Sequence, residues 1–178
     1  MEKKVIVFSL GGSIIIPDQV DNIFLKKFKK TILKYTKNYK FIIVCGGGSI
    51  ARKYIHALRQ EKAKTLLESF AGISATRMNA RFMSYFFNKN PEIGIPHTIE
   101  TLEKYLRKED IVFCGALEYK LNQTSDSTAA SIAMHFKTEF IQPLLKNSLS
   151  EEFPYFDLEA EHIVNVTAEE SEIIQQSF

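Results

Sequence analysis

Residues Phe41–Ile55 read FIIVCGGGSIARKYI and combine three features in a short space. The first five residues are an apolar run rich in β-branched side chains, which predicts a buried strand. Three glycines follow it, and from Ser49 onward Ile50, Tyr54 and Leu58 recur at helical spacing. The glycines therefore lie on a predicted turn from a strand to a helix.

A glycine turn at this position can bind an anion. Residues without a Cβ let backbone N–H groups approach a ligand closely, and a helix N-terminus adds a favourable potential for negative charge. The sequence therefore predicts a phosphate site at Gly46–Gly48. The alternative is a tight turn that needs positive φ and binds nothing, and for a lone glycine triplet the two interpretations have equal weight.

A second copy of this pattern lies near the N-terminus. Residues Val5–Ser13 read VIVFSLGGS, a strand pattern that ends in a glycine pair and a hydroxyl. Neither copy matches the P-loop consensus or the dinucleotide-binding fingerprint. Because ligands of open α/β sheets bind beyond the carboxyl ends of the strands, two such turns on neighbouring strands are expected to converge on one crevice. The second copy favours the anion-binding interpretation.

The remaining pattern predicts an α/β fold with parallel strands. Asp21 can cap a helix that leads back to the strand at Phe41, and the order strand, helix, strand, helix is typical of right-handed crossovers. Further helices are expected over 49–64, 64–70, 72–87, 97–106 and 124–133, a strand over 110–114, and less defined strands near Phe140 and over 162–166 before a short helix after Thr167.

Hydroxyls and a carboxylate gather in Thr124–Ala130, at the start of a predicted helix. Asp126 has two interpretations there. It caps the helix, which spacing alone favours at roughly two to one because such caps are common, or it lies near phosphates and orients donors or a metal ion.

Other polar residues give weaker signals. Arg77, Asn79 and Arg81 interrupt an apolar helical pattern and are expected equally at the surface or in polar contacts with a substrate or another subunit. Cys45 and Cys114 each end a predicted strand before a glycine and are expected to be buried free thiols. The four histidines are scattered without metal-ligand spacing, so no metal site built by protein side chains alone is predicted.

Composition and charge narrow the class of protein. The chain has 178 residues, of which 45% are hydrophobic and 25% charged, which is ordinary for one soluble domain. With no apolar run near the roughly twenty residues of a membrane helix and no signal-peptide core, we expect a cytoplasmic protein without a membrane partner. All 23 basic residues lie at or before Lys146, whereas eight of the 21 acidic residues follow it. The basic body favours anionic ligands, but without a reader motif nucleic acid is not an expected partner.

Four blocks of the sequence belong together, namely Leu10–Ser13, Cys45–Tyr54, Gly72–Ala80 and Thr124–Ala130. Together they resemble the amino acid kinase family and, within it, the archaeal-type uridylate kinases. They occur in the family's order and approximate spacing and cover the chain to about residue 140. The resemblance implies a three-layer αβα sandwich with a mainly parallel central sheet, as one domain over 1–178 with an acceptor-side part over 1–140 and a divergent acidic part over 141–178.

The resemblance also implies an activity, namely transfer of the ATP γ-phosphate to UMP with Mg²⁺ by a homo-oligomer, commonly a hexamer. Such transfer requires alignment of the two phosphates and neutralisation of charge, which facing glycine turns can provide. Carried over position by position, the catalytic residues would be Asp126 and Ser13, the ATP phosphates would meet Gly11, Gly12, Ser13, Gly48 and Arg52, and UMP would meet Gly46, Gly47, Ser69, Gly115 and Thr124.

Three features differ from the family pattern. Ser69 stands where the family has an aspartate for the ribose, the loop after the third strand is bulky and carries Glu118, and no adenine-nucleotide segment is recognised after Phe140. The leading hypothesis is a UMP kinase. One alternative is a non-catalytic or truncated member that binds a nucleotide or phosphorylated ligand as a regulatory or assembly subunit. A kinase of small acids or isoprenoid phosphates is a third hypothesis, against which the Thr76–Asn79 block argues.

Overall fold

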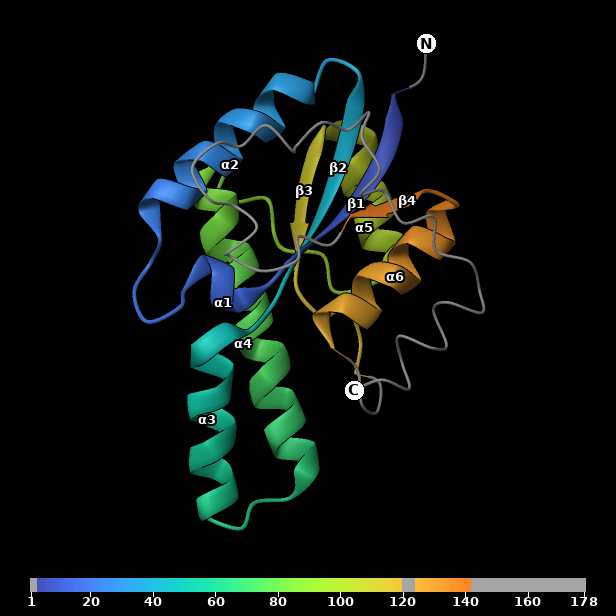
Figure 1. The fold of residues 1–178 in the computed structure, drawn as a ribbon. Coiled ribbons are helices and arrows are strands. Elements are labelled where there is room, and N and C mark those ends of the chain that lie inside the picture. Colours follow the sequence, from blue (N-terminus) through green and yellow to red (C-terminus); the bar gives the residue numbers. More distant parts are fainter. Residues whose placement is uncertain (1–2, 120–123, 142–178) are drawn as a thin grey trace.

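The computed structural model describes residues 3–119 and 124–141. A central sheet carries helices on both faces (Figure 1). All its strands pair in parallel, in the order β3-β2-β1-β4. The strands are β1 (Lys4–Leu10), β2 (Tyr39–Cys45), β3 (Ile111–Cys114) and β4 (Glu139–Ile141). The elements predicted over 162–166 and after Thr167 lie outside the described residues.

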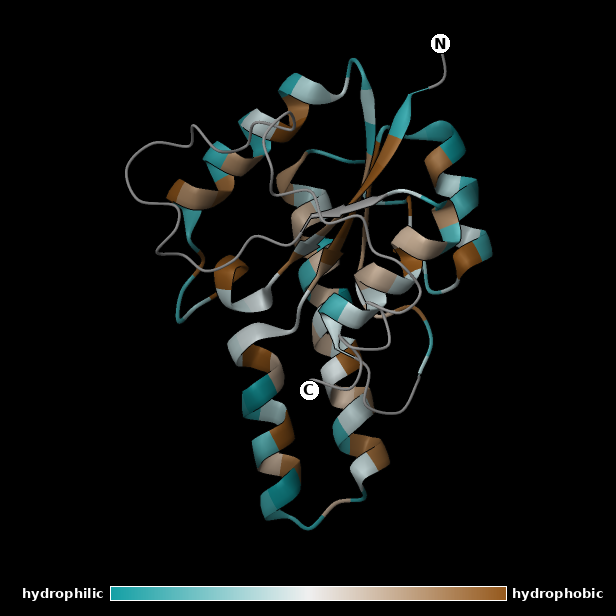
Figure 2. Ribbon diagram, turned by 45° about the vertical axis from the view of Figure 1, so that its right-hand side comes forward, coloured by the Kyte–Doolittle hydropathy of each residue, from teal (hydrophilic) through white to brown (hydrophobic). Residues whose placement is uncertain are grey.

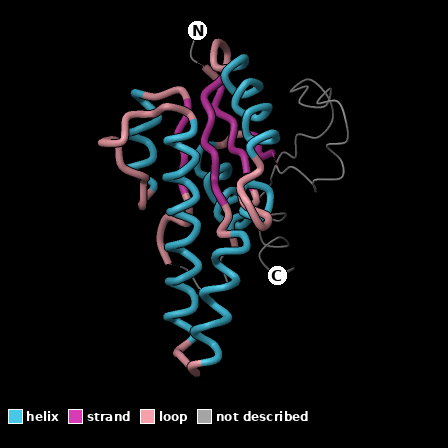
Figure 3. The backbone as a smooth tube through the Cα atoms, turned by 90° about the vertical axis from the view of Figure 1, so that its left-hand side faces the viewer, coloured by secondary structure: helices cyan, strands magenta, loops and turns pink. Residues whose placement is uncertain are grey.

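The helices connect the strands, and two of them project from the rest of the molecule. The helices α3 and α4 make a long hairpin that extends away from the sheet (Figures 1 and 3). No helix in the described part of the chain is long and apolar enough to cross a membrane. The helices are α1 (Gly12–Ile15), α2 (Asn22–Tyr35), α3 (Gly48–Gln60), α4 (Thr65–Phe86), α5 (Ile99–Lys108) and α6 (Ser125–Phe136).

Two apolar clusters lie on the two faces of the sheet. Because side chains alternate along a strand, Ile6, Phe8 and Leu10 of β1 pack with α2 and α4, whereas Val7 packs with α5 and α6. The strands are the most hydrophobic part of the ribbon and lie between the two helical layers (Figure 2). The predicted three-layer αβα sandwich with a parallel sheet is confirmed.

Two predicted helix boundaries are wrong. The separate helical stretches predicted over 64–70 and 72–87 form one helix, α4, with Gly72 inside it. A glycine costs a helix only about 1 kcal/mol, so Gly72 does not end α4, and a Cβ there would lie at an ordinary 3.5 Å from Ile55 Cδ1 of α3. The preceding helix ends at Gln60 rather than near Lys64, because Lys62 has a positive φ of 53°.

Candidate functional site

The two glycine turns contact each other at the carboxyl ends of β1 and β2. A Cβ on Gly12 would lie 2.1 Å from Gly48 N, and one on Gly46 would lie 2.5 Å from Gly12 N. Gly46 N donates a hydrogen bond to Leu10 O at 2.9 Å, and Gly48 has a φ of +62°. The predicted convergence is therefore confirmed. Close backbone packing and positive φ both require glycine here, whether or not a ligand binds.

A cleft of about 440 Å³ opens beside these turns. Its wall comes from α3, α4, the loop after β3 and the start of α6. The cleft brings together predicted site residues that lie far apart in the sequence: Gly47, Gly48, Arg52, Ser69 and Thr124.

The other predicted site residues lie outside the cleft wall. Gly12 and Gly46 are buried where the two turns touch, while Ser13 is exposed on α1 next to the partly exposed Gly11. Gly115 is also buried, and a Cβ there would lie 2.5 Å from the Thr76 hydroxyl oxygen on α4. These glycines shape the site through backbone packing.

The helices α3 and α6 begin at the cleft but differ in how their N-termini are satisfied. The N-cap of α3 is Gly47, and no side chain caps this helix, so no side chain competes with a ligand for its first N–H groups. The N-cap of α6 is Thr124, whose hydroxyl accepts from Ser127 N at 3.1 Å while Ser127 Oγ accepts from Thr124 N at 2.9 Å. The uncapped end of α3 is therefore the better anion site.

Asp126 does not cap α6, so the interpretation favoured from spacing alone is wrong. Thr124 takes that role, and the reciprocal bonds with Ser127 satisfy the donors that a carboxylate would otherwise accept from. The Asp126 carboxylate instead accepts a hydrogen bond from Ser9 Oγ of β1, at 2.5 Å. This contact joins the start of α6 to the strand that leads into the first glycine turn.

Charged and aromatic side chains complete the cleft. Arg52 is exposed on α3 and lines the wall without a side-chain ion pair among the described residues. Arg59 pairs with Glu68 of α4 at 2.7 Å, and this hydrogen bond raises the pKa of Arg59. Tyr119 stacks on Phe70 with ring centroids 5.5 Å apart. Sequence reasoning missed these pairs because they form across the hairpin or between distant segments.

The side chains of Arg77, Asn79 and Arg81 all donate hydrogen bonds to backbone carbonyl groups. Arg77 Nε donates to Ala116 O at 2.9 Å, and burial lowers the pKa of this guanidinium. Asn79 is 1% exposed and donates from Nδ2 to Gly46 O at 2.7 Å. Arg81 donates to carbonyls of the loop after α4. These polar residues of α4 thus fix the second glycine turn, the loop after β3 that lines the cleft, and the loop after α4.

The two cysteines are buried free thiols, as predicted. Burial raises the pKa of both, that of Cys114 to about 12. Because the thiolate is the reactive form, neither side chain is suited to act as a nucleophile near neutral pH.

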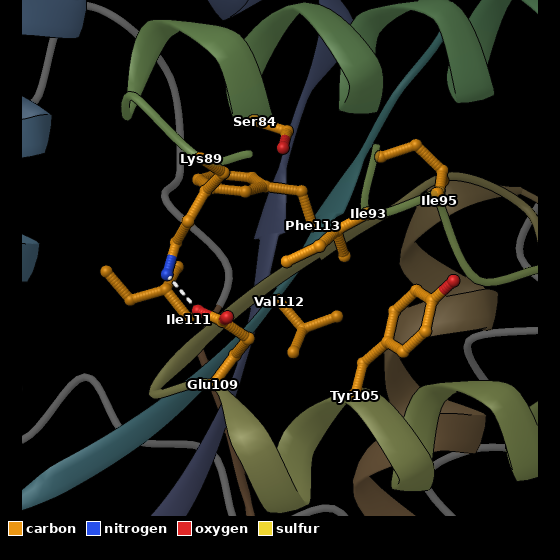
Figure 4. Close-up of a pocket in the computed structure, with 10 residues that line it drawn as sticks. Ser84, Lys89, Ile93, Ile95, Tyr105, Glu109, Ile111, Val112 and Phe113 are labelled. Carbon is orange, nitrogen blue, oxygen red and sulfur yellow. Dashed lines mark hydrogen bonds and ion pairs between the residues drawn. The ribbon is translucent and has the colours of Figure 1, made fainter. Parts of the chain in front are cut away.

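A second, smaller cavity lies at the opposite end of the sheet (Figure 4). It measures about 20 Å³ and lies between α4, α5 and the amino end of β3. The ion pair between Lys89 and Glu109, 2.7 Å long, borders it on one side. Such a volume holds about one water molecule, so this cavity is too small for a substrate.

Comparison with known proteins gives the family. The sequence profile of the amino acid kinase family matches residues 4–141. The chain belongs to the amino acid kinase family. This confirms the recognition made from the four sequence blocks.

Uridylate kinases are among the family members with similar sequences and structures. The uridylate kinase of Thermoplasma acidophilum is 38% identical over 126 residues, which are 70% of this chain and 53% of that protein. That of Thermococcus kodakarensis is 27% identical over 139 residues, 76% of this chain and 60% of that protein. The crystal structure of the Archaeoglobus fulgidus uridylate kinase has a TM-score of 0.67 and 29% identity, over 77% of this chain and 61% of that one. This chain thus covers between 53% and 61% of the length of these family members.

Proposed function

We propose that this protein is a UMP kinase-like phosphotransferase that transfers the γ-phosphate of ATP to UMP and gives UDP. The observation that carries the proposal is the cleft in which the uncapped N-terminus of α3 lies beside Arg52 and the start of α6. Membership of the amino acid kinase family and similarity to uridylate kinases support the same reaction.

The charge of the cleft favours a phosphorylated ligand. Arg52 and Arg59 line it, against the single carboxylate of Glu68 among its described lining residues. The N-terminus of α3 adds the equivalent of roughly half a positive charge, and its open N–H groups can bond phosphate oxygens. Gly47 lets a ligand approach this backbone because it has no Cβ.

Phosphoryl transfer from this site needs alignment more than acid–base chemistry. The acceptor is a phosphate oxygen that is already ionised at neutral pH, so no general base is required. The proposed roles are that Gly11, Gly12, Gly48 and Arg52 bind the ATP phosphates, with Ser13 and Asp126 next to the reacting groups, and that Gly46, Gly47, Ser69, Gly115 and Thr124 surround UMP.

A magnesium ion bound to ATP would fit this arrangement. Mg²⁺ keeps several waters and phosphate oxygens as ligands and takes only one or two protein carboxylates. Asp126 would supply a carboxylate. No group of three or more His, Cys, Asp or Glu side chains in the described ranges could hold a metal ion. The ion would neutralise charge on the transferring group.

We also propose that the protein forms a homo-oligomer, with a hexamer as the larger assembly. On α4, the exposed apolar residues Leu67, Phe70, Met78 and Tyr85 recur at helical spacing. A two-fold antiparallel contact that places the small Ser74 opposite Met78 would pair Leu67 with Tyr85 in the same register. Such a self-complementary surface is what a symmetric dimer requires.

The mass in solution tests the oligomer. Met78→Glu is expected to lower the mass measured by light scattering, because it buries a charge in the α4 contact. Ile23→Glu is the matched control, since Ile23 is an exposed apolar residue on α2, 73% accessible. Equal masses for Met78→Glu and the unchanged protein would exclude this contact.

A cytoplasmic location, where ATP and UMP are both present, is part of the proposal.

The activity is tested by titrating the purified protein with UMP and, separately, with ATP and Mg²⁺, in a calorimeter, and then assaying the mixture for ADP and UDP. We expect both ligands to bind and Asp126→Ala to abolish turnover. Arg52→Ala is expected to weaken nucleotide binding about tenfold or more, through loss of a charge-assisted hydrogen bond. Lys53→Ala, which removes an exposed neighbour on α3 outside the cleft wall, serves as the control.

Two outcomes would contradict the proposal. Binding of UMP without ATP binding or turnover would favour the non-catalytic alternative, an acceptor pocket in a regulatory or assembly subunit. If neither ligand binds, the cleft is not a nucleotide-binding site.

A further inference from the structure

Ser9 is a polar residue in the most deeply buried strand of the molecule. Residues 6–10 of β1 are all buried, and Ser9, 1% exposed, is the polar one among them. By the alternation of side chains along a strand, it faces the same side as Val7, the side covered by α6. A buried hydroxyl without a hydrogen bond costs about 1–3 kcal/mol. A partner is therefore required.

That partner is Asp126. Ser9 Oγ donates to Asp126 Oδ1 at 2.5 Å, between positions 117 residues apart in the chain. In the described ranges the Asp126 side chain has no other hydrogen bond or ion pair, so its second oxygen has no protein partner there. The cap of α6 does not use this carboxylate, because Thr124 and Ser127 satisfy each other.

The position of Ser9 is fixed by the sheet. The strand β1 lies between β2 and β4, and Ser9 stands opposite Val44 in the β2 register. Two residues further along, the chain enters the first glycine turn at Gly11. The start of α6 also touches the second turn, since a Cβ on Gly46 would lie 3.2 Å from Ser125 Oγ. A hydrogen bond from Ser9 therefore holds the carboxylate at the base of both turns.

We infer that Ser9 is a positioning residue that fixes the orientation of the Asp126 carboxylate for phosphoryl transfer. The inference rests on the proposed function. An aspartate side chain has two rotatable torsions, and one short hydrogen bond from a rigid strand restricts both. Orientation matters in this reaction because a displacement of about 1 Å at a reacting group can reduce the rate about a hundredfold.

Steady-state kinetics of single and double variants test the role. Ser9→Ala is expected to lower kcat about tenfold or more while the KM values for UMP and ATP stay within about twofold, since the residue touches no ligand. Ser9→Thr keeps the hydroxyl and is expected to restore most of kcat. In an Asp126→Asn background, Ser9→Ala is expected to cause no comparable further loss, because the carboxylate that it positions is gone.

Urea unfolding shows whether each variant folds. If Ser9→Thr is too large for its site, Ser9→Cys, of similar shape and with a weak S–H donor, takes its place. A rise in KM with unchanged kcat, or equal losses from Ser9→Ala in both backgrounds, would overturn the positioning role.

A measurement without nucleotide separates this inference from the proposed function. In protein with ¹³C-labelled aspartate carboxyl groups, the Asp126 signal is assigned by its disappearance in Asp126→Asn. We expect Ser9→Ala to move that signal and Ser9→Thr to leave it near its original position. An unmoved signal would overturn the role of Ser9 even in an active enzyme. If the unchanged protein shows no turnover, the proposed function is overturned. The catalytic role of the contact between Ser9 and Asp126 is then overturned as well.

Discussion

The polar groups at the carboxyl end of the sheet and those at the amino end differ in whether they have hydrogen-bond or ion-pair partners. At the carboxyl end, α3 begins without a side-chain cap, Arg52 is exposed, and the cleft measures about 440 Å³. At the amino end, Lys89 pairs with Glu109 at 2.7 Å, Lys40 Nζ donates to Leu106 O at 2.5 Å, and the cavity measures about 20 Å³ (Figure 4). The N-terminus of α3 and Arg52 thus leave donors without a side-chain partner at the carboxyl end, whereas the two lysines at the amino end are paired.

This difference follows from parallel topology. Each crossover helix starts where a strand ends, so helix N-termini and their unsatisfied N–H groups gather at the carboxyl end. The same end must also bring two backbone turns into contact, which only glycine allows. The carboxyl end is therefore expected to depend on a few residues that cannot be replaced, and the amino end on ordinary packing.

The largest expected effect is that of Gly12→Ala. The added Cβ would lie 2.1 Å from Gly48 N and 2.5 Å from Gly46 O, both backbone atoms that cannot rotate away. We expect a loss of about 2 kcal/mol or more in the free energy of unfolding in urea, as for overpacked sites, together with loss of nucleotide binding.

Gly11→Ala is the matched control for this change. Its Cβ would have Ile14 Cδ1 as nearest neighbour, at 3.7 Å, an ordinary contact. We expect a change within about 0.5 kcal/mol. Similar losses for both variants would mean that the two turns do not pack as closely as described.

Asn79→Ala is expected to cost about 1–3 kcal/mol. It removes the buried amide that donates to Gly46 O at 2.7 Å and leaves that carbonyl without this donor. Urea unfolding measures the loss, and calorimetry with UMP shows whether the second turn still binds. Ser74→Ala, an exposed position on the same helix, is the control. A loss below about 0.5 kcal/mol for Asn79→Ala would show that α4 does not support the turn.

Much of the fold follows from patterns that are local in the sequence. The apolar run before Gly46 and its copy before Gly11 predict two buried strands, and their crossover predicts parallel pairing. The buried state of Cys45 and Cys114 follows from the same strands. The helix boundaries are harder to predict from the sequence. Gly72 suggests the end of a helix as long as its contacts with α3 are unknown.

The site is only partly predictable for a similar reason. Gly47, Arg52 and Thr124 were expected near a ligand and do line the cleft, because short motifs place them at strand and helix ends. Spacing alone misassigned the cap of α6, since Thr124 and Asp126 are both good caps and only the geometry chooses between them. The Ser9 contact depends on which helix covers which face of β1, and a lone hydroxyl in an apolar strand was its sole sequence signal.

Gly72→Ala tests whether every glycine at the carboxyl end is required. Gly72 lies inside α4, and an added Cβ would meet Ile55 Cδ1 at an ordinary 3.5 Å. We therefore expect the variant to be more stable than the original protein by about 0.5–1 kcal/mol, the difference between glycine and alanine in a helix interior. Urea unfolding measures it. Destabilisation would instead indicate a break in α4 at this residue, as the sequence pattern suggested.

The smallest expected effect is at the amino end, for Ser84→Ala. Ser84 is 6% exposed, its hydroxyl faces the small cavity (Figure 4), and none of the described residues forms a hydrogen bond with it. Removing a buried hydroxyl that has no protein partner leaves no other group unsatisfied, so we expect a change in unfolding free energy within about 0.5 kcal/mol. UMP and ATP titrations should be unchanged, because the cavity lies away from the glycine turns. A loss above about 1 kcal/mol would mean that a water molecule in the cavity bonds Ser84, and the amino end would then also depend on a specific polar contact.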